Sequence, residues 1–269
     1  MTSPFTPKTL SFLRSLKRNN DREWFRARKA EYERHVRGPM IQLIEALAAD
    51  FPKVAPGFVA DPKLSLYRIY RDTRFSADKT PLKTHVAAHF PQRGMRRGDG
   101  AGLYVEIAVD GVWAGGGIYM PSSADLAAIR AHIAATHPRL HKLATHAAFT
   151  RAVGELAGER LTRVPRGYAR DHPAAHYLQF RQFLGGAAWE PAFATSRRLY
   201  PELCRVFSAV APLAAFLNTA LRLHAAPPSL LTSAVPGHAL PGRAVPVNGA
   251  PTRHPRPAGA RRQAPAPMW

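Results

Sequence analysis

Apolar positions recur at helical spacing at both ends of the chain. Leu10, Leu13 and Leu16 form such a stripe behind Thr6, which a proline follows as at the start of many helices. A second helix is predicted with Asn20 as its N-cap, three residues before a glutamate, the spacing of a capping box. The same reasoning predicts helices over residues 20–36, 39–51, 123–133, 138–156, 191–195 and 197–221.

Strand patterns lie between these groups of helices. Residues 64–70 alternate, so Arg68 is expected to share a face with Leu66 and Tyr70 and to point into a half-buried environment. Residues 84–90 form a second predicted strand.

The clearest strand signal is a hairpin, GLYVEIAVDGVWAGGGIYM. Its Asp110-Gly111 pair favours a type I′ turn. Glycines 115–117 lie inside the second strand and indicate close approach of a ligand or of another backbone, or simply tight packing. With a short predicted strand at 176–184, the pattern indicates an α+β fold: an antiparallel sheet flanked by N-terminal and C-terminal helices.

The C-terminal part of the chain differs in composition. No carboxylate follows Glu202, and residues 224–269 contain ten prolines and five arginines. Such a segment buries too little apolar surface to offset its ordering entropy. We therefore predict one domain over residues 4–223 and a disordered, basic, Pro-rich tail over 224–269, which is either a polyanion-binding arm or a dispensable extension.

Charge narrows the classes of partner. There are 38 Lys and Arg against 18 Asp and Glu, a net charge of +20, which favours contact with polyanions, although the abundance of Arg, Ala, Pro and Gly also offers a purely compositional explanation. Cys204 is the only cysteine, so no internal disulfide forms, and it is expected in the core. The N-terminus lacks a signal-peptide core and no 18-residue apolar run occurs, so a cytoplasmic location without a membrane span is expected.

Residues 68–85, RIYRDTRFSADKTPLKTH, carry the densest charge, and we call them the charged segment. Up to Lys83 they hold five basic side chains and two acids, a surplus of three positive charges. Buried charges must be paired or bind a ligand, which predicts an anion pocket, or instead an ion-pair network completed by acids elsewhere, such as Glu23, Glu31, Glu106 or Asp171. The predicted ligand-binding residues are Arg68, Arg71, Arg74, Lys79 and Lys83, and Asp72 and Asp78 would orient them or act as acid or base.

At these residues the chain resembles the uncharacterised conserved hypothetical protein family, domain of unknown function 2461. The motif is Arg-x-x-Arg-Asp-x-Arg-Phe at 68–75 followed by Asp-Lys at 78–79. The resemblance extends to LKRNNDREWF (16–25), GGGIYMP (115–121) and VPRGYARDHP (164–173), and covers about residues 8–223. Leu82 stands where the family usually has tyrosine. The family has no established activity, so the resemblance implies a domain boundary and motif residues, not a function.

Two further groups are candidates for the site. Asn20 and Arg22 lie at a predicted helix N-terminus and would either join the anion site or serve the helix end only. Asp171 and His172 would form an acid–base pair if the fold brought them beside the arginines, or else a simple turn. No metal site and no cofactor motif is predicted.

The sequence thus favours a protein that binds a small anionic ligand, as an enzyme or a sensor. A nucleic-acid-binding module and a structural or partner-binding domain are the alternatives.

Overall fold

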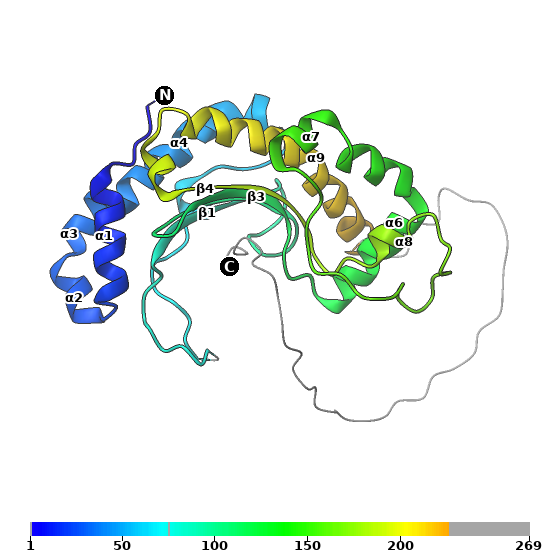
Figure 1. Ribbon diagram of the computed structural model, residues 1–269, viewed down its shortest axis with the longest axis horizontal. Coiled ribbons are helices and arrows are strands. Elements are labelled where there is room, and N and C mark those ends of the chain that lie inside the picture. Colours follow the sequence, from blue (N-terminus) through cyan, green and yellow to red (C-terminus); the bar gives the residue numbers. More distant parts are fainter. Residues whose placement is uncertain (1, 75, 226–269) are drawn as a thin grey trace. The chain divides into compact units, whose positions relative to one another are not determined.

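The computed structural model describes residues 2–74 and 76–225, so the predicted tail from residue 226 onward lies outside the described residues. Helices from both ends of the chain flank a four-stranded antiparallel sheet, which confirms the α+β class (Figure 1). The described residues up to His224 pack as one compact unit.

The N-terminal third is helical. Its elements are α1 (Pro7–Arg18), α2 (Arg22–Ala27), α3 (Lys29–Tyr32), a π-helical turn η1 (Glu33–Arg37), α4 (Gly38–Val54) and α5 (Pro62–Ser65). The predicted N-cap of the second helix was wrong by one residue. Asp21 caps α2, because its Oδ1 accepts hydrogen bonds from the backbone N–H groups of Glu23 and Trp24.

The sheet has the order β1-β2-β3-β4, and neighbouring strands are antiparallel. The strands are β1 (His85–Pro91), β2 (Gly102–Ala108), β3 (Val112–Ile118) and β4 (Phe183–Trp189). The predicted β2–β3 hairpin is confirmed, but its type I′ turn is not. The backbone N–H of Ala108 donates to the carbonyl of Gly111 at 2.8 Å, so Gly111 closes the turn, and it does not have the positive φ of a type I′ centre.

The C-terminal half contributes the remaining helices. They are α6 (Ser123–Ala144), α7 (Ala147–Val153), α8 (Ala175–Leu178), the 3-10 turn η2 (Pro191–Thr195) and α9 (Leu199–Ala225). The predicted boundary inside 123–156 is a break at Thr136 (φ −134°), two residues before Pro138. The predicted strand at 176–184 was misplaced, because α8 occupies its first part and β4 begins only at Phe183.

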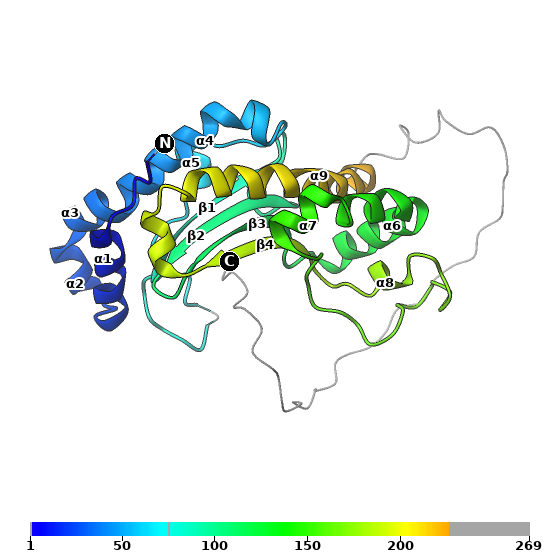
Figure 2. The same cartoon turned by 45° about the horizontal axis from the view of Figure 1, so that its top comes forward.

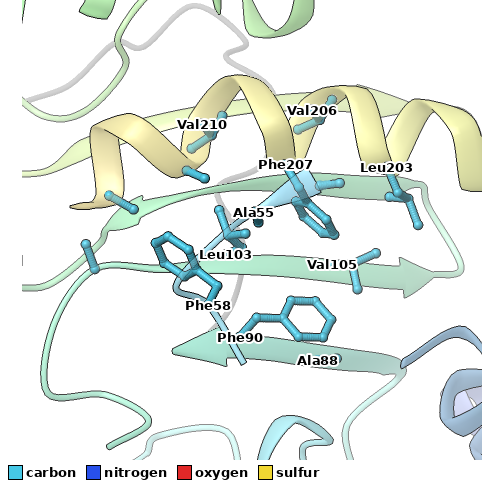
Figure 3. Packing of buried hydrophobic residues seen from close by; sticks show 14 of the residues in the cluster. Ala55, Phe58, Ala88, Phe90, Leu103, Val105, Leu203, Val206, Phe207 and Val210 are labelled. Carbon is cyan, nitrogen blue, oxygen red and sulfur yellow. The ribbon is translucent and has the colours of Figure 1, made fainter. Parts of the chain in front are cut away.

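One face of the sheet forms the core. Leu103 and Val105 point from β2 towards α9, and Figure 3 shows Phe207 of α9 above Phe90 of β1. The rings of Phe90 and Phe207 lie 5.6 Å apart. Helices α4, α7 and α9 lie on this same side of the sheet in both views (Figures 1 and 2).

Helix α9 is the one described helix that is long and apolar enough to cross a membrane, with a mean hydropathy of 1.5. It is mostly buried: in its most apolar stretch of 18 residues, 61% is covered by the rest of the protein. Its apolar character is therefore that of a core helix.

The glycines of β3 are explained by packing. A Cβ on Gly115 would lie 2.2 Å from the carbonyl oxygen of Gly185 on β4, and one on Gly117, whose φ is +126°, would lie 1.9 Å from that of Phe183. The close approach is that of another backbone, the neighbouring strand β4, which is one of the predicted alternatives.

Candidate functional site

The charged segment folds back beside β1 as an irregular ribbon. Three main-chain hydrogen bonds hold it, from Tyr67 to Ala87 (3.0 Å), Lys83 to Ile69 (2.8 Å) and Arg71 to Pro81 (2.9 Å). The predicted strand at 64–70 was therefore wrong: this stretch contains α5 and isolated bridges only. Its alternation is also reversed, because Ile69 is buried while Arg68 and Tyr70 are exposed.

Asn20 fixes the return half of this ribbon. Its side-chain amide donates to the carbonyl of Leu82 at 2.9 Å, and its Oδ1 accepts the backbone N–H of Leu82 at 3.0 Å. Asn20 thus joins the N-terminal helices to the charged segment, and its carbonyl and amide are both engaged. Arg22 is exposed at the start of α2.

The tip of the charged segment satisfies its own charges. Arg74 makes a bidentate pair with Asp72, with bonds of 3.0 and 2.7 Å, and this pairing lowers the pKa of Asp72 to about 2. Arg71 contacts Asp78 and Thr80. The backbone hydrogen bond from Thr80, followed by the bond from Arg71, lowers the pKa of Asp78 to about 2.

Lys79 also lies at the tip, where its Nζ donates to the carbonyl of Thr73 at 3.0 Å. The ion-pair interpretation therefore fits Arg71 and Arg74, and their acids come from the charged segment itself. Asp72 and Asp78 are the partners of Arg74 and Arg71.

Lys83 is different, because it is half-buried and forms no ion pair with any carboxylate of residues 2–74 and 76–225. Its Nζ lies 4.5 Å from the centre of the Tyr67 ring, and the guanidinium of Arg97 lies 4.5 Å from the same ring. Arg97 also donates to the carbonyls of Leu64 and Leu66, at 3.3 and 3.1 Å.

Several charged side chains surround Lys83 and shift its pKa. Burial lowers the pKa of Lys83, the charge of Arg97 lowers it further, and Arg68 and Arg71 act in the same direction. Glu106 is the acid that opposes them. We call Arg68, Arg71, Lys83 and Arg97 the basic cluster.

Next to the basic cluster lies the sheet face that points away from α9. We call its side chains the polar face: His85, His89, Tyr104, Glu106 and Trp113. The hydroxyl of Tyr104 donates to Oε2 of Glu106 at 2.6 Å, and Nε2 of His85 lies 3.8 Å from that oxygen. Burial raises the pKa values of Tyr104 and Glu106. Burial, followed by the charge of Lys83, lowers the pKa of His85 to about 4, so this imidazole is neutral at pH 7.

Sequence reasoning missed Tyr67, Arg97 and Tyr104 and treated Glu106 only as a reserve acid. A signal was present in GLYVEIA, where a tyrosine and a glutamate alternate with aliphatic residues. A carboxylate inside an otherwise apolar strand marks a sheet face that is not ordinary core.

Asp171 and His172 do not join this site. Their loop forms a turn, in which Nδ1 of His172 accepts the backbone N–H of Ala174 at 2.9 Å. Figures 1 and 2 show their loop beside α8, away from the charged segment next to β1.

A separate shallow depression of about 390 Å³ lies over the N-terminal helices. It is lined by Lys8, Ser11, Phe12, Ser15, Trp24, Arg28, Glu31 and His35. Its lining mixes both signs of charge. Across the residues that the structure describes, no group of three or more His, Cys, Asp or Glu is placed to hold a metal ion.

These features define an α+β domain in which helices cover one face of an antiparallel sheet and the other face carries buried polar groups beside a basic cluster. The chain belongs to the conserved hypothetical protein family DUF2461, whose model matches residues 8–216, from α1 into α9. The resemblance drawn from the sequence is thereby confirmed. No curated protein and no solved structure was found to match the chain.

Proposed function

We propose that this domain binds a small anion, phosphate or carboxylate, at the basic cluster, and that it does so in the cytoplasm. The observation that carries the proposal is the position of Lys83, half-buried among three arginines. A buried cation is costly unless a partner compensates for its lost hydration. An anion at this point would supply that compensation.

The balance of charge favours a ligand here over an internal network. Asp78 pairs with Arg71, and Glu106 is the acid whose charge acts on Lys83, against the like charges of Arg97 and Arg68. Burial raises the pKa of Glu106, so this acid is itself a reluctant counter-charge. The Tyr67 ring stabilises Lys83 and Arg97 through its π face but adds no negative charge.

The geometry suits an oxyanion. Arg97 is oriented by its two bonds to backbone carbonyls, both made by Nη1. Within the described ranges no hydrogen bond from its Nε or Nη2 is found, so that edge of the guanidinium could bind a second oxygen-bearing group. Planar guanidinium edges match phosphate and carboxylate oxygens well.

The predicted ligand-binding residues are expected to contribute unequally to anion binding. Lys83 moves to the centre, Arg97 is added, and Arg68 and Arg71 stay at the edge. Arg74 and Lys79 lie at the exposed tip with their charges engaged, so they are expected to contribute little. The class of ligand stays as the sequence suggested, a small phosphorylated or carboxylated molecule.

A thermal-shift titration with inorganic phosphate and a panel of phosphorylated metabolites tests the proposal, since a ligand of the native state raises Tm. Lys83→Met keeps the apolar stem and removes the charge, and Lys142→Met is the matched control at an exposed lysine of α6. We expect wild type and control to respond alike and folded Lys83→Met to lose the response. A wild-type response in folded Lys83→Met would overturn the proposal.

Nucleic acid is the second candidate, favoured by the net charge of +20. Polynucleotide binding through many phosphate contacts falls steeply with salt, whereas a pocket that binds one or two charges responds weakly. A steep log–log slope that survives Lys83→Met would favour this alternative over the small-anion site.

A further inference from the structure

Glu106 and His85 lie beside the basic cluster, and anion binding alone does not account for them. His85 is buried with 7% of its surface exposed, and its Nε2 has no hydrogen-bond partner in the part of the chain that the structure describes. Buried polar atoms are nearly always hydrogen-bonded, so an orphaned ring nitrogen calls for an explanation.

The neighbouring carboxylate shows what that nitrogen lacks. Oε2 of Glu106 lies 3.8 Å from Nε2 of His85, too far for a hydrogen bond. A single small group placed beside the two atoms can lie at about 3 Å from both. The Glu106 side chain keeps 14% of its surface exposed, against 6% for His85, so Glu106 is the more exposed of the two, while Nε2 of His85 is itself covered.

The hydrogen-bonding properties of Oε2 of Glu106 and Nε2 of His85 indicate which ligand group fits between them. An ionised carboxylate only accepts hydrogen bonds, whereas an imidazole nitrogen donates or accepts according to tautomer. A hydroxyl has one donor and two acceptor positions, so it can donate to Glu106 and accept from His85. A cationic amine would also suit Glu106, but Lys83 and the arginines repel it.

We infer that Glu106 and His85 bind a hydroxyl group of the ligand, while the basic cluster binds its anionic group. The inference rests on the proposed function and narrows it to small phosphate or carboxylate compounds that carry a hydroxyl close to the anionic group. Lys83 and His85 lie two residues apart where the chain enters β1, and the charge of Lys83 acts on both His85 and Glu106, so the two proposed subsites are neighbours.

Two probes that differ by one hydroxyl test the inference. Ethyl phosphate and 2-hydroxyethyl phosphate are titrated calorimetrically into the full chain. We expect both to bind, with 2-hydroxyethyl phosphate bound about tenfold more tightly, the effect of one good charge-assisted hydrogen bond. His85→Phe keeps the ring and removes the nitrogen, and should reduce the preference to about twofold or less. Lys83→Met should weaken both probes equally.

A second readout does not depend on a variant that folds. In wild type, the ¹⁵N resonance of the His85 ring should move with 2-hydroxyethyl phosphate and stay in place with ethyl phosphate.

The outcomes separate the two claims. Equal binding of the two probes overturns the hydroxyl subsite and leaves the anion site standing. No binding of either probe overturns both. A preference that persists in His85→Phe, together with an unmoved His85 resonance, places the hydroxyl elsewhere and overturns the assignment to this pair.

Discussion

The two faces of the sheet are built from the same strands and are buried to similar degrees, yet they hold different chemistry. On the core face Leu103 and Val105 meet α9 and are fully buried. On the polar face Tyr104 is 1% exposed and His85 7%, but there the buried atoms include a hydroxyl and an orphaned ring nitrogen. Burial of apolar area stabilises the fold, whereas burial of polar groups costs free energy unless they are paired. Alternate residues of β2 thus differ in role: one set stabilises the core, and the other holds the buried polar groups to which we assign ligand recognition as a proposal.

The largest expected effect tests the core face. Phe207→Ala removes a fully buried ring that packs against Phe51 and Phe90, so it should lower the free energy of unfolding by about 3–5 kcal/mol in urea denaturation. The control Leu223→Ala, on an exposed stretch of the same helix, should cost less than about 0.5 kcal/mol. Similar losses for the two variants would refute the assignment of the core face.

The second prediction concerns pH and the polar face. Burial lowers the pKa values of His85 and His89 to about 4, from 6.5 for an ordinary histidine. The unfolded chain therefore takes up protons between pH 6.5 and 4 that the folded protein does not, and stability falls as pH falls through this window. Each histidine contributes up to about 3 kcal/mol to this loss. Glu106, with its raised pKa, acts in the opposite direction.

Unfolding free energies at several pH values between 7 and 4 measure this slope. His85→Phe should flatten it, because one of the two groups no longer titrates. Parallel curves for the variant and wild type would contradict the buried, neutral state of His85.

A third prediction tests the ribbon that carries Lys83 to the polar face. Asn20→Ala removes both hydrogen bonds to Leu82 and should cost about 1–3 kcal/mol, because it leaves backbone groups of a buried residue unpaired. Phosphate affinity should fall as well, since the ribbon loosens. Asn19→Ala, at the exposed end of α1, is the matched control and should cost less. Equal losses of unfolding free energy for Asn20→Ala and Asn19→Ala in chemical denaturation would contradict the role of Asn20 in holding the ribbon.

The smallest effect is expected at the tip of the charged segment. Arg74 is exposed and its charge is neutralised by Asp72, so Arg74→Gln should change the phosphate Kd by less than about twofold. Arg97→Gln, in the basic cluster, should weaken binding several-fold more in the same calorimetric titration. The reverse order would place the anion site at the tip instead of at the basic cluster.

The sequence predicted the fold class, the β2–β3 hairpin, strand β1 (predicted at 84–90) and the long last helix, because these follow from local periodicity and turn residues. It failed where tertiary contacts override local rules. Asn20 was predicted as a helix cap, but its side-chain amide donates to the carbonyl of Leu82, 62 residues away. Asp21 caps the helix instead. Arg68 reads as half-buried, but the ribbon's register turns Ile69 inward and leaves Arg68 exposed.

The proposed site follows from the sequence only in part, for the same reason. The local surplus of charge placed Lys83 among the predicted ligand-binding residues, but the pairing at the tip depends on how the loop folds. Arg97 contacts the Tyr67 ring, although the two residues are 30 positions apart and no spacing rule indicates the contact. The Tyr104–Glu106 pair becomes a candidate for binding only because the fold places His85 next to Glu106.

The most direct test of the central claim, an anion site at the basic cluster, is a chemical-shift map of the isotopically labelled chain titrated with inorganic phosphate. We expect changes concentrated at Tyr67, Lys83 and Arg97, with little change at Arg74 and Lys79. Changes scattered over exposed lysines and arginines, with Lys83 and Arg97 unmoved, would contradict an anion site at the basic cluster.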